Sequence, residues 1–477
     1  MARVSGPGEG YINGAVSLPL TRRFAAPSPF GRGELLRMPA MFANKEILVK
    51  SRIGALILLT ITASFIVTPT ARAQAAPPAT AAETSTVDDT ISASEADAAP
   101  SRKFITWNEF DGKYVTARVG GGFLYEFNAY AQSDESKQQF AMHPQEKVRD
   151  FRVLLKGTFK FFKRPVTYQF GYMYDAALGE WRVRQSGIMV DVPEILGSIF
   201  VGRAKEGFSL NKVMVGYAGW TNERFTMNDA MIPILADGVK WLGHDKKHHM
   251  IWNLGIFKDW ISQKESFSTY DHQVVGRIAW LPKMADTDKT VLHIGLGARY
   301  GVPKDHRLQP RSRPESFTAP YFLDTGKFDV NNTKMLGPEV YYRPGSLLIG
   351  SEYFFQKVDA PQSGNPLFHG GDVFVSWLAT GEVRTYNTRG GYFNGVVPAH
   401  SIFSGGRGAW ELVGRFSYTD LDGGTLRGGK FWRITPMVNW HMSPNMRLEM
   451  VYGYGSLDKF NITGGTQFFQ TRIQFQL

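Results

Sequence analysis

The chain has 477 residues, and its 54 lysines and arginines outnumber 43 aspartates and glutamates, which gives a formal net charge of +11. It contains no cysteine, which excludes disulfides, a thiolate nucleophile and a zinc–thiolate site. Glycine (50 residues) and aromatic residues (13%) are abundant, and the mean hydropathy of −0.22 excludes a bundle of membrane-spanning helices. A transmembrane β-barrel stays possible, because its strands alternate apolar and polar side chains.

An apolar run near the N-terminus has the features of a secretory signal. Ile53–Val67 is too short to span a bilayer as a helix, which takes about 20 residues. Basic residues precede it, and the A-x-A cleavage motif Ala71–Ala73 follows. We therefore predict export with cleavage after Ala73, and residues 1–73 are interpreted as an upstream extension plus signal peptide. A buried helix is the alternative interpretation of this run.

Residues 74–100 are expected to form a flexible acidic arm, because they hold five acidic residues, no basic one and few large apolar side chains. The remaining body, 101–477, has 45 basic and 35 acidic residues, a net charge of +10. No second linker interrupts it, so we predict a single domain. Its charge suggests an anionic partner or permeant. Nucleic acid would have the right sign, but an exported chain would rarely meet it, so we predict no nucleic-acid partner.

The body is expected to be all-β. In Phe151–Lys163, apolar side chains at odd positions alternate with mostly basic or polar ones at even positions. A period of two places these sets on opposite faces of a strand. Arg164-Pro165 then turns the chain, and Val166–Asp175, rich in aromatic and β-branched residues, returns as the second strand of a hairpin.

Similar segments of about ten residues recur to the C-terminus. Short turns join many of them, whereas Gly/Pro-rich stretches such as Gly301–Lys334 and Tyr386–Gly408 are long. Short turns at one end and long loops at the other are typical of transmembrane β-barrels. In the last segment, Gln467–Leu477, one face suits lipid and the other a water-filled lumen. A soluble β-sandwich would also alternate, but the export signal, the aromatic content and the single domain favour a barrel.

The segment Ile199–Asp229 departs from this alternation. It begins as a strand and continues as an irregular, glycine-containing stretch with too much apolar surface for disorder. Most of its charged residues are basic. We expect it to fold back into the barrel as an inward-folded constriction loop that lines the narrowest point with cations.

Basic side chains are the main functional signal, because a pore lined with arginine and lysine selects anions, and arginine binds phosphate in a bidentate manner. We predict an anion-binding constriction formed by Lys205, Lys212 and Arg224. Strand faces predict further pore-lining side chains at Arg152, Lys156, Lys160, Arg182, Arg184 and Arg203. For any one of these, the alternative is an ordinary lumen residue paired with an acid.

Other chemistries are less favoured. The chain has no G-x-S-x-G elbow, and His369–Asp372 only superficially resembles an oxyanion motif, so we predict no enzyme and no catalytic residue. His244, His248 and His249 could bind a metal, but the two lysines between them would repel a dication. We therefore favour a solvated turn, without metal or cofactor. Tryptophans and tyrosines are interpreted as membrane-interface girdles, with sugar-stacking rungs as the alternative.

Several motifs resemble the phosphate-selective porins O and P of Gram-negative outer membranes. They are R-S-R-P-E-S in Arg311–Gly326, T-G-E-V-R-T-Y in Ser376–Tyr386, G-A-W-E-L in Gly408–Asp422, the segment Val438–Leu448, and Val201–Leu210 followed by Glu223-Arg224. The resemblance covers 101–477 and implies a transmembrane antiparallel β-barrel of about 16 strands. It also implies a trimer, an inward-folded loop and an Arg/Lys-lined anion path. Gly207 stands where the family has proline, and Leu477 where it commonly ends in phenylalanine.

These observations together predict a passive porin in the lipid of the bacterial outer membrane. Its expected substrates are small anions, with inorganic phosphate or polyphosphate foremost, and its expected assembly is a homotrimer. A weakly selective general porin, and a structural or adhesive barrel that uses its long loops, are the alternatives.

Overall fold

The computed structural model describes residues 108–175, 179–258, 260, 269–285 and 289–477. All of them lie in the second of the two units into which the chain divides, Thr84–Leu477. The predicted signal peptide (1–73) and acidic arm (74–100) lie outside the described residues, and both stay predictions. Within the described ranges, no helix is long and apolar enough to cross a membrane.

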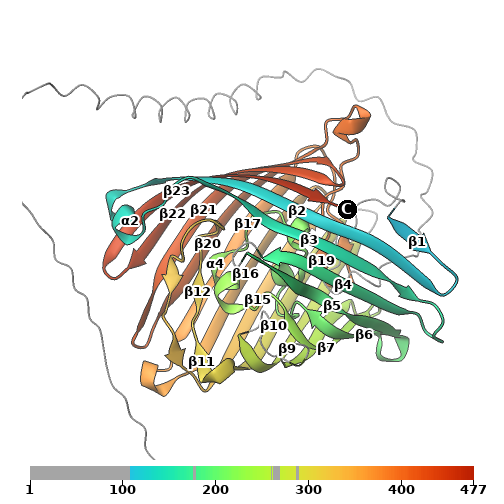
Figure 1. Ribbon diagram of the computed structural model, residues 1–477, viewed down its shortest axis with the longest axis horizontal. Helices are drawn as coiled ribbons and strands as arrows, with labels where there is room; N and C mark the ends of the chain where they lie inside the picture. The colour runs from blue at the N-terminus through green and yellow to red at the C-terminus, as the bar shows by residue number, and fades with distance from the viewer. Residues whose placement is uncertain (1–107, 176–178, 259, 261–268, 286–288) are drawn as a thin grey trace, which may run out of the picture. The chain divides into compact units, whose positions relative to one another are not determined.

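Sixteen antiparallel strands close into a barrel (Figure 1), which confirms the predicted fold. Each strand pairs with the next in the chain, and β2 closes the barrel by pairing with β23, from Gly122↔Gln476 to Gln132↔Thr466. The short strand β1 (Glu109–Asp111) joins the same sheet beside the start of β2. The barrel strands are β2 (Val115–Gln132), β3 (Gln145–Phe159), β4 (Val166–Asp175), β5 (Glu180–Val192), β6 (Gly197–Ala204), β7 (Ala236–Asp245), β8 (Met250–Lys258), β9 (Tyr270–Ala285), β10 (Thr290–Pro303), β15 (Asn332–Pro344), β16 (Leu347–Asp359), β17 (Leu367–Leu378), β20 (Ala409–Gly423), β21 (Leu426–Ser443), β22 (Met446–Lys459) and β23 (Ile462–Gln476).

Short elements occupy the connections between the barrel strands. The helical ones are α2 (Asp134–Gln139), η2 (Pro193–Ile195), α3 (Leu210–Val213), η3 (Gly216–Ala218), α4 (Thr226–Met231), η4 (Lys304–His306), η5 (Pro361–Ser363) and η6 (Ile402–Ser404). The extended ones are β11 (Arg307–Leu308), β12 (Arg311–Ser312), β13 (Leu323–Asp324), β14 (Phe328–Asp329), β18 (Tyr386–Asn387) and β19 (Tyr392–Phe393). They form three two-stranded sheets separate from the barrel: β11 with β14, β12 with β13, and β18 with β19.

The alternation along each strand sorts side chains between the two faces of the barrel wall. In β3, Phe151 and Val153 are exposed on the outside, whereas Arg152 and Lys156 are buried on the inside. Phe475 near the C-terminus is likewise exposed. An apolar outer face and a polar inner face are what a barrel surrounded by lipid requires.

Protein fills part of the barrel interior, mainly as two hydrophobic clusters. In one, Phe208 from the connection between β6 and β7 packs edge-on against Phe354 of β16, with ring centroids 5.2 Å apart. In the other, Trp220 from the same connection stacks on Phe374 of β17 at 4.4 Å. Because these clusters occupy volume inside the wall, they restrict where water and solutes can pass.

The connections that enter the interior come from both ends of the barrel. Since successive strands run in opposite directions, connections 205–235 and 304–331 lie at one end and 379–408 lies at the other. The labels β11 and β12 mark the first end in Figure 1, and the C-terminus marks the second. Phe393 of 379–408 joins the cluster that contains Trp220. The expectation of long loops at one end only is therefore wrong at 379–408, whose Tyr392 and Phe393 are buried inside the barrel.

Candidate functional site

The connection 205–235, called here the inward loop, leaves β6 and docks first on the wall strands β15 and β16. Glu339 of β15 accepts a hydrogen bond from the main-chain N–H of Leu210 at 2.8 Å. Glu352 of β16 accepts one from the N–H of Asn211, also at 2.8 Å. Both N–H groups belong to the first turn of α3, where main-chain donors lack helical partners. The two wall carboxylates therefore hold the beginning of α3 in place.

Glycines provide room for this docking. Gly297 of β10 and Gly337 of β15 lie opposite each other on neighbouring strands, so no side chain projects from the wall at this point. A Cβ on Gly297 would lie 2.0 Å from the main-chain oxygen of Phe208, and one on Gly337 would lie 2.8 Å from the Phe208 ring. Gly207 in the loop is equally confined, because its Cβ would lie 2.1 Å from the Asn253 side chain. The loop therefore approaches the wall closely at residues that must stay small.

Further along, polar side chains of β20 to β23 bind the main-chain oxygens of the inward loop. The bonds run from Gln474 to Tyr217 (3.0 Å), from Arg447 to Gly219 (2.6 Å), from Asn439 to Trp220 (2.9 Å) and from Arg415 to Glu223 (2.8 Å). Each satisfies a carbonyl that the irregular loop leaves without a secondary-structure partner. The loop is thus attached to two separate parts of the wall and crosses the interior between them.

The connection 304–331 also folds inward and attaches to the same wall. Ser417 of β20 donates to the carboxylate of Glu315 at 2.6 Å, and Arg415 forms an ion pair with it. Arg433 of β21 donates to the main-chain oxygen of Pro314 at 2.7 Å. These contacts place the R-S-R-P-E-S motif inside the barrel.

A cavity of about 280 Å³ lies between the inward loop, connection 304–331 and the wall formed by β23 and β2 to β5. Its lining is rich in charge, and basic side chains outnumber acidic ones. The eight basic side chains are Arg149, Arg152, Arg184, Lys205, Lys212, Arg224, Arg313 and Arg472. The four acidic ones are Asp150, Glu223, Asp229 and Glu315.

All three predicted constriction residues line this cavity. Lys205 and Lys212 are buried in the protein and Arg224 is half-buried. Each donates to a main-chain oxygen of the loop itself, from Lys205 to Met214 (2.8 Å), from Lys212 to Ile232 (3.0 Å) and from Arg224 to Asn211 (2.9 Å). The structure brings them together, while their role in anion binding stays a prediction.

The six predicted pore-lining residues divide into three pairs. Arg152 and Arg184 line the cavity beside Asp150, which lies 3.0 Å from Nε of Arg152 and 3.9 Å from Nη1 of Arg184. Lys156 on β3 is buried and Arg182 on β5 is half-buried, but neither is among the described residues that line the cavity.

The last pair, Lys160 and Arg203, differs from the expectation. Lys160 follows the end of β3, is exposed and pairs with Asp111. Arg203 is buried in a bidentate ion pair with Asp237, with Nε 2.6 Å from Oδ1 and Nη2 3.1 Å from Oδ2. The physical reason is register, since Arg203 and Asp237 face each other across β6 and β7.

Three of the eight basic cavity residues were absent from the predicted site: Arg149, Arg313 and Arg472. Arg472 lies on the lumen face that the alternation in Gln467–Leu477 predicts, but Arg149 and Arg313 carried no such signal. Alternation from Phe151 would turn Arg149 outward, yet the β2–β3 register shifts there: Asp150 pairs with Leu124 and Val148 with Tyr125. Such a bulge reorients a side chain. Arg313 required knowing that connection 304–331 folds inward.

Two acidic residues of the inward loop have pKa values shifted in opposite directions. Burial would raise the pKa of Glu223, but Arg149 and Arg472 outweigh it and hold that pKa well below its usual range. Asp229 on α4 is open to the cavity on one side. Loss of water on its protein-facing sides disfavours the charged carboxylate and raises its pKa, and the positive charge of Lys212 partly compensates. Glu223 therefore keeps its charge, whereas Asp229 binds a proton more readily than an ordinary aspartate.

The turn with His244, His248 and His249, considered above as a metal site, lies at the protein surface, with His244 half-buried and the other two exposed. His248 is exposed, and its Nδ1 lies 2.5 Å from a carboxylate oxygen of Asp245. Across the ranges that the structure describes, no group of three or more His, Cys, Asp or Glu side chains is arranged to hold a metal ion.

A closed antiparallel barrel with connections folded into a charged lumen defines the porin class of membrane proteins. In-vitro folded OmpT, an outer membrane protein of Vibrio cholerae, aligns with a TM-score of 0.50 and 11% identity, covering 77% of this chain and 99% of OmpT. An anion-selective porin from Comamonas acidovorans aligns with a TM-score of 0.46 and 12% identity, over 76% of this chain and all of that one. At such identities the likeness concerns the fold.

The chain belongs to the phosphate-selective porin O and P family, whose model matches residues 118–477. This confirms the resemblance drawn from its motifs and identifies a multi-pass β-barrel of the outer membrane. Family and fold point to a channel and away from an enzyme. An uncharacterized protein of Caulobacter vibrioides is 28% identical over 182 residues, a region that spans 37% of this chain and 36% of that relative.

Proposed function

We propose that this porin serves the passive diffusion of small anions, with phosphate or polyphosphate as the preferred substrates. The cavity lining carries the proposal, because eight basic side chains face four acidic ones there. In a narrow lumen with low-dielectric walls, such an excess concentrates anions and repels cations.

Lys205, Lys212 and Arg224 would form the anion-binding constriction, with Arg152 and Arg184 as approach sites on the wall. Lys156 and Arg182 would act further along the same strands. Arg313 would contribute from connection 304–331, where its guanidinium lies 4.6 Å from the centroid of the Tyr321 ring. Its Nη1 donates to the main-chain oxygen of Ala319, and stacking on the ring leaves the other N–H groups of the guanidinium available to an anion. Several shallow sites suit conduction, since a permeant must leave as readily as it enters.

Homotrimeric assembly belongs to the same proposal and rests on the resemblance to the family. The outer wall exposes apolar side chains such as Phe151 and Trp181, which lipid or a neighbouring subunit can cover. Arg152, Lys160 and Arg203 each form an ion pair within the barrel protein, with Asp150, Asp111 and Asp237 respectively, so the positive charge of each is partly offset by an acid.

A weakly selective general porin is the second candidate, because four carboxylates share the cavity with the cations. A structural or adhesive barrel is the third, since apolar clusters fill much of the interior. Single-channel recording in planar bilayers separates the three. The main proposal expects chloride to dominate the reversal potential in a KCl gradient, and phosphate to block the chloride current.

The matched variants are Lys212→Ala, within the cavity, and Lys327→Ala, an exposed lysine of connection 304–331 outside the cavity lining. In Lys212→Ala the phosphate concentration that halves the current should rise about tenfold, for a lost contact of ~1.4 kcal/mol. Lys327→Ala should match the unsubstituted protein. A preference for potassium would overturn the proposal, absence of conductance would favour the structural barrel, and chloride preference without phosphate block would favour the general porin.

A further inference from the structure

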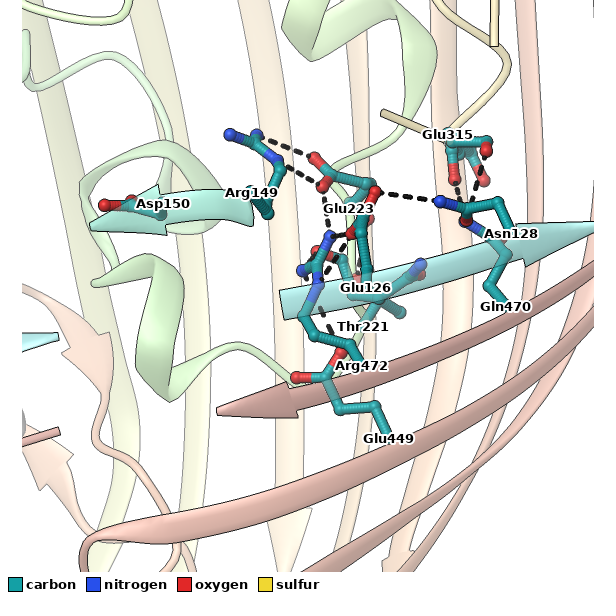
Figure 2. Close-up of polar contacts among 12 residues, drawn as sticks. Glu126, Asn128, Arg149, Asp150, Thr221, Glu223, Glu315, Glu449, Gln470 and Arg472 are labelled. Atoms are coloured by element: carbon teal, nitrogen blue, oxygen red, sulfur yellow. Dashed lines mark hydrogen bonds and ion pairs between the residues drawn. The ribbon is translucent and has the colours of Figure 1, made fainter. Parts of the chain in front are cut away.

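A network of charged side chains occupies the seam where β23 closes on β2 (Figure 2). Glu223 of the inward loop accepts two hydrogen bonds from Arg149 of β3, from Nε at 2.8 Å and from Nη2 at 3.2 Å. Arg472 of β23 donates to the same carboxylate and, at 2.9 Å, to Glu126 of β2. Glu449 of β22 lies 3.9 Å from Arg472.

Glu449 forms its closer ion pair with Arg447 of β22, so Glu126 and Glu223 are the carboxylates that balance Arg149 and Arg472. Two of the basic side chains that line the cavity, Arg149 and Arg472, are thus offset by acids. The side chain of Glu223 is 19% exposed and that of Arg149 is 31% exposed, whereas Glu126 and Glu449 are almost completely buried. A permeating ion therefore reaches the network at Glu223 and Arg149.

We propose that Glu223 is a resident counter-ion that determines specificity: it occupies the guanidinium of Arg149, where a permeating oxyanion would otherwise bind. A carboxylate in bidentate contact with arginine has the geometry that sulfate and phosphate adopt. Glu223 is held beside its partner by its main chain, since Arg415 donates to its carbonyl oxygen at 2.8 Å. The Glu223 carboxylate therefore competes with anions from solution for the guanidinium of Arg149. This competition limits how tightly divalent anions bind there. This inference rests on the proposed anion porin and deepens it.

Removal of the Glu223 charge should leave both arginines in position. Arg472 keeps its ion pair with Glu126. Arg149 keeps its stacking contact with Phe317 of connection 304–331, at 4.2 Å from the ring centroid. The guanidinium of Arg149 would then face the cavity without its carboxylate and form a second anion site.

Glu223→Gln tests the inference, with Glu194→Gln as the matched control. Glu194 of η2 forms the same kind of pair with an arginine, Arg164, but it is exposed and is absent from the cavity lining. The ratio of anion to cation permeability should rise in Glu223→Gln by up to about fivefold, the effect of one unit charge at ~4 Å in water. Block of the chloride current by sulfate should strengthen. Glu194→Gln should leave both quantities unchanged.

Arg149→Gln and the double variant Arg149→Gln/Glu223→Gln complete the test. Arg149→Gln alone should lower the ratio of anion to cation permeability, because it removes one of the two guanidiniums that neutralise Glu223. This variant also tests the inference if Glu223→Gln does not assemble. The double variant should return to the unsubstituted ratio and lose the gained sulfate block. An unchanged Glu223→Gln, an unchanged Arg149→Gln, or sulfate block that survives in the double variant would overturn the inference. A cation-selective unsubstituted channel would instead overturn the proposed function.

Discussion

Gly297→Ala is expected to displace the inward loop from the wall of the barrel. The new Cβ would lie 2.0 Å from the main-chain oxygen of Phe208, a separation that real Cβ atoms essentially never show. Because the obstacle is main chain, no change of rotamer can relieve the clash. Strand β10 is held on both sides, where Gly297 pairs with Gly337 and Arg277, so the loop has to move.

The magnitude depends on how far the loop moves. A shift that keeps its contacts costs about 1–3 kcal/mol, as for other overpacked sites. Complete detachment would forfeit the burial of Phe208, roughly 1.5–3 kcal/mol, and the hydrogen bonds to Glu339 and Glu352, roughly 1.5–3 kcal/mol each. We therefore expect the free energy of unfolding to fall by about 1–3 kcal/mol and the loop to become more mobile.

Single-channel conductance and denaturant-induced unfolding measure these two effects. Displacement of the loop should change the unit conductance and speed tryptic cleavage at loop residues such as Lys212. Gly414→Ala is the control, since the nearest atom to a Cβ there is Cγ1 of Val375 at 3.7 Å, an ordinary contact. The reasoning fails if Gly297→Ala and Gly414→Ala have the same conductance and the same unfolding midpoint.

Three further predictions follow from charged groups inside the barrel. Because the pKa of Asp229 is raised, lowering the pH should remove its charge earlier than that of an ordinary aspartate and increase chloride preference, and Asp229→Asn should lose this increment; an identical pH profile would contradict it. Since the folded-state pKa of Glu223 is lowered, its stabilising contribution is present above its unfolded pKa and lost as pH falls through the folded one, so Glu223→Gln should flatten the acid limb of stability against pH. Glu411→Gln should lower the free energy of unfolding by about 3–5 kcal/mol, because buried Arg384 loses a bidentate partner that it contacts through Nε at 3.0 Å and Nη2 at 2.9 Å; an unchanged melting temperature would refute this.

Much of the fold could be predicted because strand alternation is a local property of the chain. The exposed Phe151 and the buried Arg152 follow from a period of two, and so do the two faces of the C-terminal strand. The short turns and repeated aromatic segments then require a closed sheet in lipid. Connection 379–408 was expected at the end with the other long loops, but it lies at the opposite end. The length of a connection shows only that it is not a tight turn, not at which end of the barrel it lies.

The site could be predicted only in part, because several of its members depend on pairing between distant strands. The inward orientation of Arg149 comes from a register shift against β2, which alternation within β3 cannot reveal. Arg203 is paired with Asp237 because β6 and β7 meet in one particular register. Arg313 joins the cavity only because connection 304–331 binds to β20 and β21.

The sequence by itself determined that Ile199–Asp229 is an irregular, mostly basic interruption of an all-β chain, since composition and lost alternation are visible residue by residue. Only the tertiary structure decided what that segment contacts. Glu339 and Glu352 hold its first turn, and Arg149 and Arg472 bind Glu223. These partners are far apart in the chain and meet because closure of the barrel brings their strands around the loop. Which cations are offset by acids, and which face the path, is therefore a property of the assembled barrel.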